Sequence, residues 1–166
     1  IATLNITPVN DPPTATITPA TYAAQQGITL NLHGSGLAVA DPDHGGGTVT
    51  VTLSVDEGTL SVSEGSNVVT VGGSGTAAVT LTGTVEAIND RLDGNNSATV
   101  GYDVAASPAA SATLTLDIND GGNTGGGALS ANDTASIAIT QTPSVENTVP
   151  PAQSVDEDNA LVFSVG

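Results

Sequence analysis

Apolar and polar residues alternate with a period of two along most of this chain, which is the pattern of strands with one buried and one solvated face. The clearest run is residues 48–55, where valines and a leucine alternate with threonines and a serine. The pattern recurs in shorter segments at 28–33, 60–62, 69–71, 79–81, 100–104, 112–118 and 135–139. Turns rich in Gly, Asp, Asn and Ser separate these segments. Many short strands joined in this way predict an all-β fold, an antiparallel Greek-key-like β-sandwich.

One segment has a helical period instead. Its apolar residues are Val85, Ile88 and Leu92. Thr84 precedes them as a capping residue, and Arg91 stands in the last turn, where a cation suits the helix dipole. The sequence therefore predicts one short helix near 84–92, crossing an end of the sandwich.

A long internal repeat sets the expected domain organisation. "ATLNIT" at 2–7 matches "ASIAIT" at 135–140, a shift of 133 residues, which is the length of a whole domain. We therefore expect residues 1–8 to be the last strand of a preceding repeat and 9–141 to be one complete repeat. Residues 142–166 are then a linker and the first strands of the next repeat. The chain is accordingly expected to be an excerpt from a longer polypeptide.

Charge excludes several classes of partner. The 166 residues contain 17 acidic residues and one arginine, for a formal net charge of −16. Such a chain repels nucleic acid and anionic membranes, so neither nucleic-acid binding nor membrane insertion is expected. No apolar run reaches the length of a membrane span. Cysteine is absent, which excludes disulfides and thiol chemistry.

The acidic residues gather where the strand pattern predicts loops at the two ends of the domain. Candidates at the upstream end are Asn10, Asp11, Asp41, Asp43, Asp117, Asn119 and Asp120. Candidates at the downstream end, in the next repeat, are Asp156, Glu157 and Asp158. Calcium takes six to eight oxygen ligands from carboxylates, Asn side chains and backbone carbonyls, and these clusters predict Ca²⁺ sites. The alternative is that Asp and Asn only start turns and keep the loop ends solvated.

The series of motifs resembles a known family. "PVNDPP", "VADPDHGGGTVTVTLSV", "GTVEAINDRL", "INDGGNTGGGAL" and "VDEDNALVFS" are similar to the tandem cadherin-like repeats of large bacterial surface adhesins, several of them RTX-type. The resemblance implies a cadherin- or Ig-like sandwich with calcium at the junctions. It implies Asn10 and Asp11 as linker ligands, Asp41 and Asp43 as the Asp-x-Asp pair, and Glu157 as the basal acid. This repeat departs from the family in its own basal turn, which is expected at 23–25 and reads Ala-Ala-Gln.

The function expected from these features is a secreted or cell-surface extender repeat, stiffened by Ca²⁺ at its junctions and supporting cell adhesion or biofilm formation. Its partners are the adjacent repeats, and the parent adhesin is expected to carry a cell-surface or glycan ligand. No enzyme is expected, because His33 and His44 lack neighbouring catalytic partners in the sequence. The alternative, from another class, is a carbohydrate- or ice-binding module that uses an exposed sheet face carrying Thr48, Thr50 and Thr52.

Overall fold

The computed structural model describes residues 4–63 and 69–143. Within them the chain forms eleven strands, one α-helix and one short 3₁₀ turn. In chain order these are β1 (Thr14–Ile17), β2 (Thr21–Gln25), β3 (Leu30–Asn31), β4 (Leu37–Ala40), β5 (Val49–Val55), β6 (Thr59–Val62), β7 (Thr70–Gly72), β8 (Ala78–Gly83), α1 (Val85–Leu92), η1 (Asn95–Ser97), β9 (Val100–Asp103), β10 (Ser111–Asn119) and β11 (Ser130–Thr140). The α-helix is eight residues long, and no helix of the described residues is long and apolar enough to cross a membrane.

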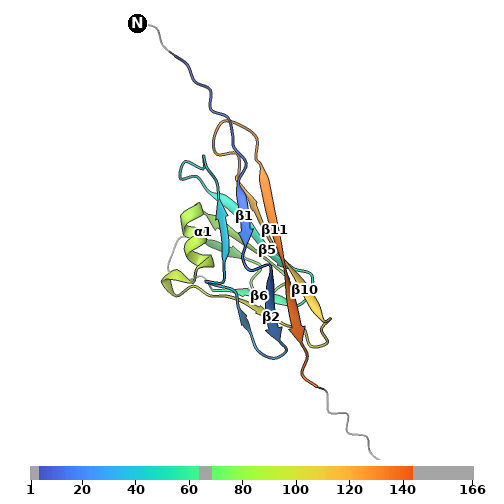
Figure 1. Ribbon diagram of the computed structural model, residues 1–166. Helices are drawn as coiled ribbons and strands as arrows, with labels where there is room; N and C mark the ends of the chain where they lie inside the picture. The colour runs from blue at the N-terminus through green and yellow to red at the C-terminus, as the bar shows by residue number, and fades with distance from the viewer. Residues whose placement is uncertain (1–3, 64–68, 144–166) are drawn as a thin grey trace, which may run out of the picture.

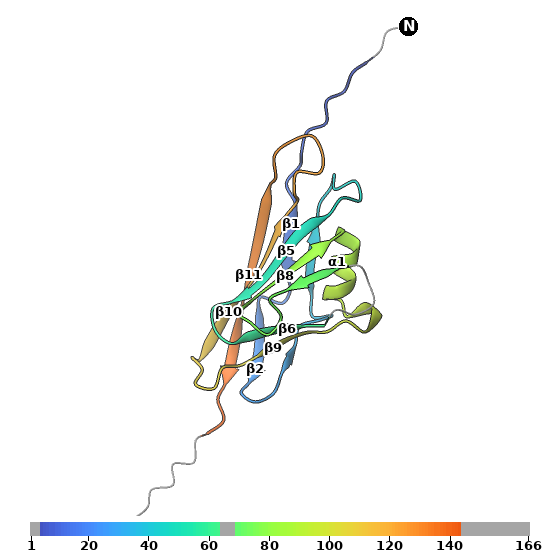
Figure 2. The same ribbon diagram turned by 180° about the vertical axis from the view of Figure 1, so that it is seen from behind.

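The strands form a β-sandwich (Figures 1 and 2). A six-stranded sheet has the order β2-β11-β10-β5-β8-β7, and it faces a three-stranded sheet, β3-β9-β6, and the pair β1-β4. Every neighbouring pair is antiparallel except β2 and β11. The chain leaves β1, which pairs with β4, and crosses directly to the edge of the larger sheet as β2. There β2 runs in the same direction as β11, which makes this pair parallel. The predicted all-β sandwich with one helix is confirmed.

The core is built from the inward positions of the alternating strands. In β5, Val49, Val51 and Leu53 are at most 1% exposed, and Ile137 of β11 is fully buried. Tyr102, on the opposite sheet, is also fully buried. Because side chains alternate between faces, a one-residue slip of β5 would turn its threonines inward and its valines outward. The apolar pattern therefore fixes the strand register.

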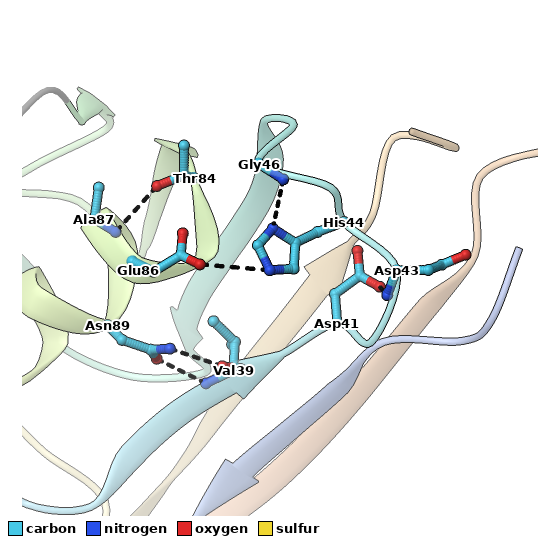
Figure 3. A network of polar contacts seen from close by, with 9 residues as sticks. All are labelled: Val39, Asp41, Asp43, His44, Gly46, Thr84, Glu86, Ala87 and Asn89. Carbon is cyan, nitrogen blue, oxygen red and sulfur yellow. Dashed lines mark hydrogen bonds and ion pairs between the residues drawn. The ribbon is translucent and has the colours of Figure 1, made fainter. Parts of the chain in front are cut away.

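The helix forms where its cap and period predicted it. The Thr84 hydroxyl accepts a hydrogen bond from the Ala87 amide at 3.3 Å. The helix packs against β4 through Asn89, whose side chain accepts from the Val39 amide at 3.0 Å and donates to the Val39 carbonyl at 2.8 Å (Figure 3). Arg91 is fully buried and donates to the Ser63 carbonyl, so this cation also holds the helix against the chain that follows β6.

Two local predictions are wrong. The strand expected at 28–33 is reduced to Leu30–Asn31, with Ile28 left 58% exposed. The turn expected at 23–25 is instead the end of β2, which pairs with Ala138–Thr140 of β11. The reason is the inward alternation of Tyr22 and Ala24, which are 7% and 5% exposed and pack in the core.

The chain enters and leaves the sandwich at opposite ends (Figures 1 and 2). Residues 4–9, before β1, form no helix or strand. Leu4 and Ile6 are 83% and 77% exposed, whereas the residues that match them in the repeat, Ile137 and Ile139, are 0% and 9% exposed. That residues 1–8 complete a preceding repeat, and that the repeat spans 9–141, remain predictions.

The repeat boundary can be tested with a tandem chain in which residues 9–134 are followed directly by residues 2–166. If residues 2–7 replace β11 of the first unit, Leu4 occupies the position of the fully buried Ile137. Leu4→Ala is then expected to destabilise the first unit by about 2–5 kcal/mol, measured by calorimetry. In the original chain the same change is expected to cost less than about 0.5 kcal/mol.

Asn5→Ala is the matched control, since Asn5 corresponds to the exposed Ala138. It is expected to be silent in both chains. A tandem chain whose first unit melts identically with and without Leu4→Ala would show that the boundary is misplaced.

Candidate functional site

Three segments converge at the upstream end of the sandwich: residues 8–11, the loop after β4 and the loop between β10 and β11 (Figure 1). The Asn10 amide nitrogen donates to Asp120 Oδ2 at 2.7 Å and to the Gly127 carbonyl at 3.0 Å. The approach is close enough that a Cβ on Gly125 would lie 2.3 Å from the Pro8 carbonyl oxygen. The glycine run that follows β10 is therefore what lets the entering chain lie against this loop.

Asp41 is a buried carboxylate at the end of β4. Only 6% of the residue is exposed, and its Oδ1 accepts from the Asp43 amide at 3.3 Å (Figure 3). Burial raises the Asp41 pKa, and the nearby carboxylates of Asp43 and Asp120 raise it further, against the lowering effect of the Asp43 amide. The carboxylate of Asp41 is therefore repelled by those of Asp43 and Asp120 in this structure.

Asp43 carries an oxygen with no partner. Its Oδ2 accepts from the Asp11 amide at 3.1 Å, and its backbone carbonyl accepts from the Thr124 hydroxyl at 2.5 Å. Its Oδ1 is buried and has no hydrogen-bond partner among the described residues. A buried carboxylate oxygen without a hydrogen-bond partner is costly. A cation is one kind of group that would satisfy this atom.

Asp120 is fully buried and well bonded. Its Oδ1 accepts from the amides of Gly122 and Leu129, both at 2.8 Å, and its Oδ2 accepts from Asn10. Burial acts to raise the Asp120 pKa, but these bonds outweigh it and lower the pKa overall. Asp120 therefore closes its own loop as well as contributing charge to the cluster.

The remaining predicted ligands lie elsewhere. Asp117 was expected in the upstream loop, but it belongs to β10, on the outward face of the sheet opposite Thr52 and Asn132. Asn119, two residues on, donates to the Ser130 hydroxyl at 2.9 Å and accepts from the Gly121 amide at 3.0 Å. The structure thus brings together Asn10, Asp11, Asp41, Asp43 and Asp120. The predicted ligands Asp156, Glu157 and Asp158 lie outside the described residues.

No group of three or more His, Cys, Asp or Glu side chains within residues 4–63 and 69–143 is arranged to hold a metal ion. The cluster therefore needs further oxygen ligands, from Asn side chains, backbone carbonyls or a neighbouring unit, before it can complete a calcium coordination shell.

His44 positions the loop that carries the aspartates. Its Nδ1 accepts from the Gly46 amide at 3.1 Å, and its Nε2 lies 3.4 Å from Glu86 Oε1 in the first turn of α1 (Figure 3). The Glu86 pKa is lowered by hydrogen bonds from its own amide and from the Thr84 side chain. His44 thus links this loop to the helix N-terminus.

The acids at the downstream end are engaged in hydrogen bonds. Asp56 Oδ1 accepts from the Thr113 amide at 2.7 Å, and both Glu57 oxygens accept from the Ala109 amide at 2.8 and 2.9 Å. They hold the start of β10 and the loop before it.

Neutral amides hold the exit of the chain instead. Gln26 donates to the Ala106 carbonyl at 2.6 Å, and its Oε1 accepts from the amide and hydroxyl of Thr142 at 3.1 and 2.9 Å. Gln141 donates to the Pro108 carbonyl at 2.7 Å. An uncharged pocket of about 650 Å³ lies among these residues. Sequence reasoning missed Gln26, because nothing in the local pattern distinguishes it from Gln25.

Comparison with known proteins adds little. No protein-family model matches the chain, and no curated protein matches it. Among solved structures, a cohesin module from a family 33 glycoside hydrolase of Clostridium perfringens is similar, with 13% identity and a TM-score of 0.43. The match covers 83% of this chain and 100% of that one. A similarity this distant carries no argument about function.

Asp56 gives a pH-dependent contribution to stability that can be measured. The hydrogen bonds from Thr113 lower its pKa below the ordinary value of 3.8, so the charged form is favoured in the folded state. The stability that charged Asp56 contributes is therefore fully present above pH 3.8, and it is lost as the pH falls through the lower pKa of the folded state. We expect Asp56→Asn to reduce stability at pH 7 by less than about 1 kcal/mol, because the site is exposed.

The gap between Asp56→Asn and the parent should close in thermal melts as the pH falls below the folded-state pKa of Asp56. Asp93→Asn, which removes the same charge at an exposed position, is the control for the general effect of net charge. A gap that persists unchanged at low pH would contradict the assignment.

Proposed function

We propose that this chain is an extender repeat of a secreted or surface-attached bacterial adhesin, which binds Ca²⁺ at the junction with a preceding repeat. The observation that carries the proposal is the buried, unpartnered Oδ1 of Asp43 beside the buried carboxylate of Asp41. The entry and exit of the chain at opposite ends suit a unit that transmits length along a series (Figure 1).

The donors at the upstream end fit calcium by their chemistry. Asp41, Asp43 and Asp120 supply carboxylates. Asn10 adds the oxygen of its side-chain amide, and the nitrogen of the same amide donates to Asp120. All are hard oxygen donors, which suit Ca²⁺ better than the softer ions that favour nitrogen or sulfur. A bound cation offsets the mutual repulsion that raises the Asp41 pKa. Asp11 contributes through its backbone, since its amide holds Asp43 in place.

The downstream junction has a different chemistry. Positions 23–25 belong to β2, and Asp56 and Glu57 are bonded to the chain near β10. The exit is held through residue 142 by the Gln26 amide. We therefore propose that the two ends of the repeat differ. The upstream junction depends on a cation, and the downstream exit of the chain is held by hydrogen bonds between uncharged groups.

The alternative from another class, a carbohydrate- or ice-binding module, has less support as a binder of sugars. Thr50 and Thr52 do lie on the outward face of β5, while Thr48 precedes the strand. Tyr22 and Tyr102 are 7% and 0% exposed, so the described residues offer no aromatic platform on which a sugar ring would stack.

Calcium is expected to raise the Tm of the parent chain. Asp41→Asn is expected to change both this rise and the Tm measured in chelator. Binding at about 100 times Kd adds about 2.7 kcal/mol, equivalent to a rise in Tm of roughly 5–10 °C. Asp41→Asn is expected to abolish most of that rise. In chelator the same variant should melt at or above the parent, because it removes a buried charge that repels Asp43 and Asp120.

Asp93→Asn is the matched control, since it removes one charge at the end of α1 and should leave the calcium response intact. A calcium response of the Asp41→Asn, Asp43→Asn double variant equal to that of the parent would show that the ion binds elsewhere.

The proposed difference between the two junctions can be tested in a three-repeat chain by small-angle scattering. Chelator is expected to shorten the particle by loosening the cation-dependent junctions. Gln26→Ala is expected to shorten the particle in saturating calcium as well, because the exit of the chain loses its hydrogen bonds to Thr142. Gln25→Ala, one residue away and outward-facing on β2, is the control. If chelator leaves the particle length unchanged while Gln26→Ala still shortens it, the proposal of a calcium-dependent junction is overturned. The role proposed for the Gln26 hydrogen bonds at the exit of the chain is then retained.

A further inference from the structure

The outward face of the six-stranded sheet is broad and nearly uncharged. Neighbouring outward positions follow from the strand registers, and they consist of small hydroxyl and amide side chains with a few Ala and Gly. The hydroxyl and amide positions are Thr21, Gln25, Thr50, Thr52, Ser54, Thr70, Thr80, Thr82, Ser111, Thr113, Thr115, Asn119, Ser130, Asn132, Thr134, Ser136 and Thr140.

Acidic side chains are almost excluded from this face. The chain carries 17 acidic residues and a net charge of −16. Among the outward positions of the described strands in this sheet, Asp117 is the one charged residue. The chain contains no lysine and its one arginine lies in α1, so acidic residues are the only charged residues this face could carry, and it carries one.

The size of the face matches a specific protein interface. Six strands about 4.8 Å apart, with paired segments several residues long at about 3.3 Å per residue, give an area on the order of 600 Å². Two such faces together bury roughly 1,200 Å², which is the lower end of the range for specific interfaces. The side chains are short, so two sheets can approach closely over the whole area.

We propose that this face is where two copies of the chain associate, sheet against sheet, about a two-fold axis. Copies with a net charge of −16 repel one another through any acidic surface, whereas this six-stranded face carries a single carboxylate among its outward positions. Hydroxyl and amide groups both donate and accept hydrogen bonds, so identical faces complement each other, whereas carboxylates only accept. Apart from Asp117, the face has no charge to attract a charged partner, and it has no aromatic side chain to stack on a sugar.

Asp117 limits the strength of this association. Its register neighbours are Thr52 of β5 and Asn132 of β11, in the middle of a row that continues through Thr80 to Gly72. A second copy on this face places a neutral surface over that carboxylate and must desolvate it. The association is therefore expected to be weak for a single unit and to strengthen along paired series of units through multivalency.

The proposal is independent of the calcium junction and is tested in chelator, by sedimentation of the full chain over a range of concentrations. Association is expected to strengthen with added NaCl, because salt screens the repulsion between two anionic copies. Thr80→Glu with Thr115→Glu is expected to weaken the dimer at least tenfold, since a two-fold interface places each new charge in the contact twice. Asp117→Asn is expected to tighten it several-fold.

The matched control is Asn31→Glu with Thr59→Glu, which adds the same charge at exposed strand positions of the smaller sheet. Circular dichroism confirms that each variant is folded. The proposal is overturned if the chain stays monomeric at all salt and protein concentrations, or if both double variants weaken association equally. It is also overturned if the face variants instead abolish binding to an insoluble neutral polysaccharide, here cellulose, while the chain stays monomeric.

Discussion

The structure depends on the register of β5, β10 and β11, which together form the middle of the larger sheet. Their inward positions supply fully buried Val, Leu and Ile side chains, and no tryptophan or methionine exists to fill an imperfect fit. A core of short, branched side chains gains its stability from close interdigitation over many strands. Once this register is set, the loops that follow β4 and β10 must meet at one end of the sandwich, which brings Asp41, Asp43 and Asp120 together.

Electrostatics is the main opposing force. A single arginine cannot neutralise 17 acidic residues, and this arginine is itself buried against the Ser63 carbonyl. The fold deals with the excess in three ways. Some carboxylates, such as Asp56 and Glu57, accept backbone amides at loop starts. The upstream cluster concentrates charge where a divalent cation would offset it. The large sheet keeps its outer face nearly uncharged.

The two ends of the sandwich therefore differ in what holds the chain. Upstream, Asn10 and Asp11 connect the entering segment to Asp120 and Asp43, so this contact depends on charge. Downstream, Gln26 connects Thr142 to the 106–108 loop without any charge. In the series of repeats that we propose, the upstream contact is the one expected to respond to cation concentration.

The sequence by itself determined the sandwich, the helix at Val85–Leu92 and the grouping of Asn10, Asp11, Asp41 and Asp43, because these follow from local period, capping and loop position. Tertiary structure decided the rest. Ala23–Gln25 became a strand because β11 offered a parallel edge to it, and Asp117 became a surface residue because β10 runs two residues past it. The burial of Arg91, the position of the Asp43 carboxylate and the hydrogen bonds of Gln26 each depend on partners 28 to 116 positions away in the chain. No local pattern encodes such contacts, since they exist only once the sheets have paired.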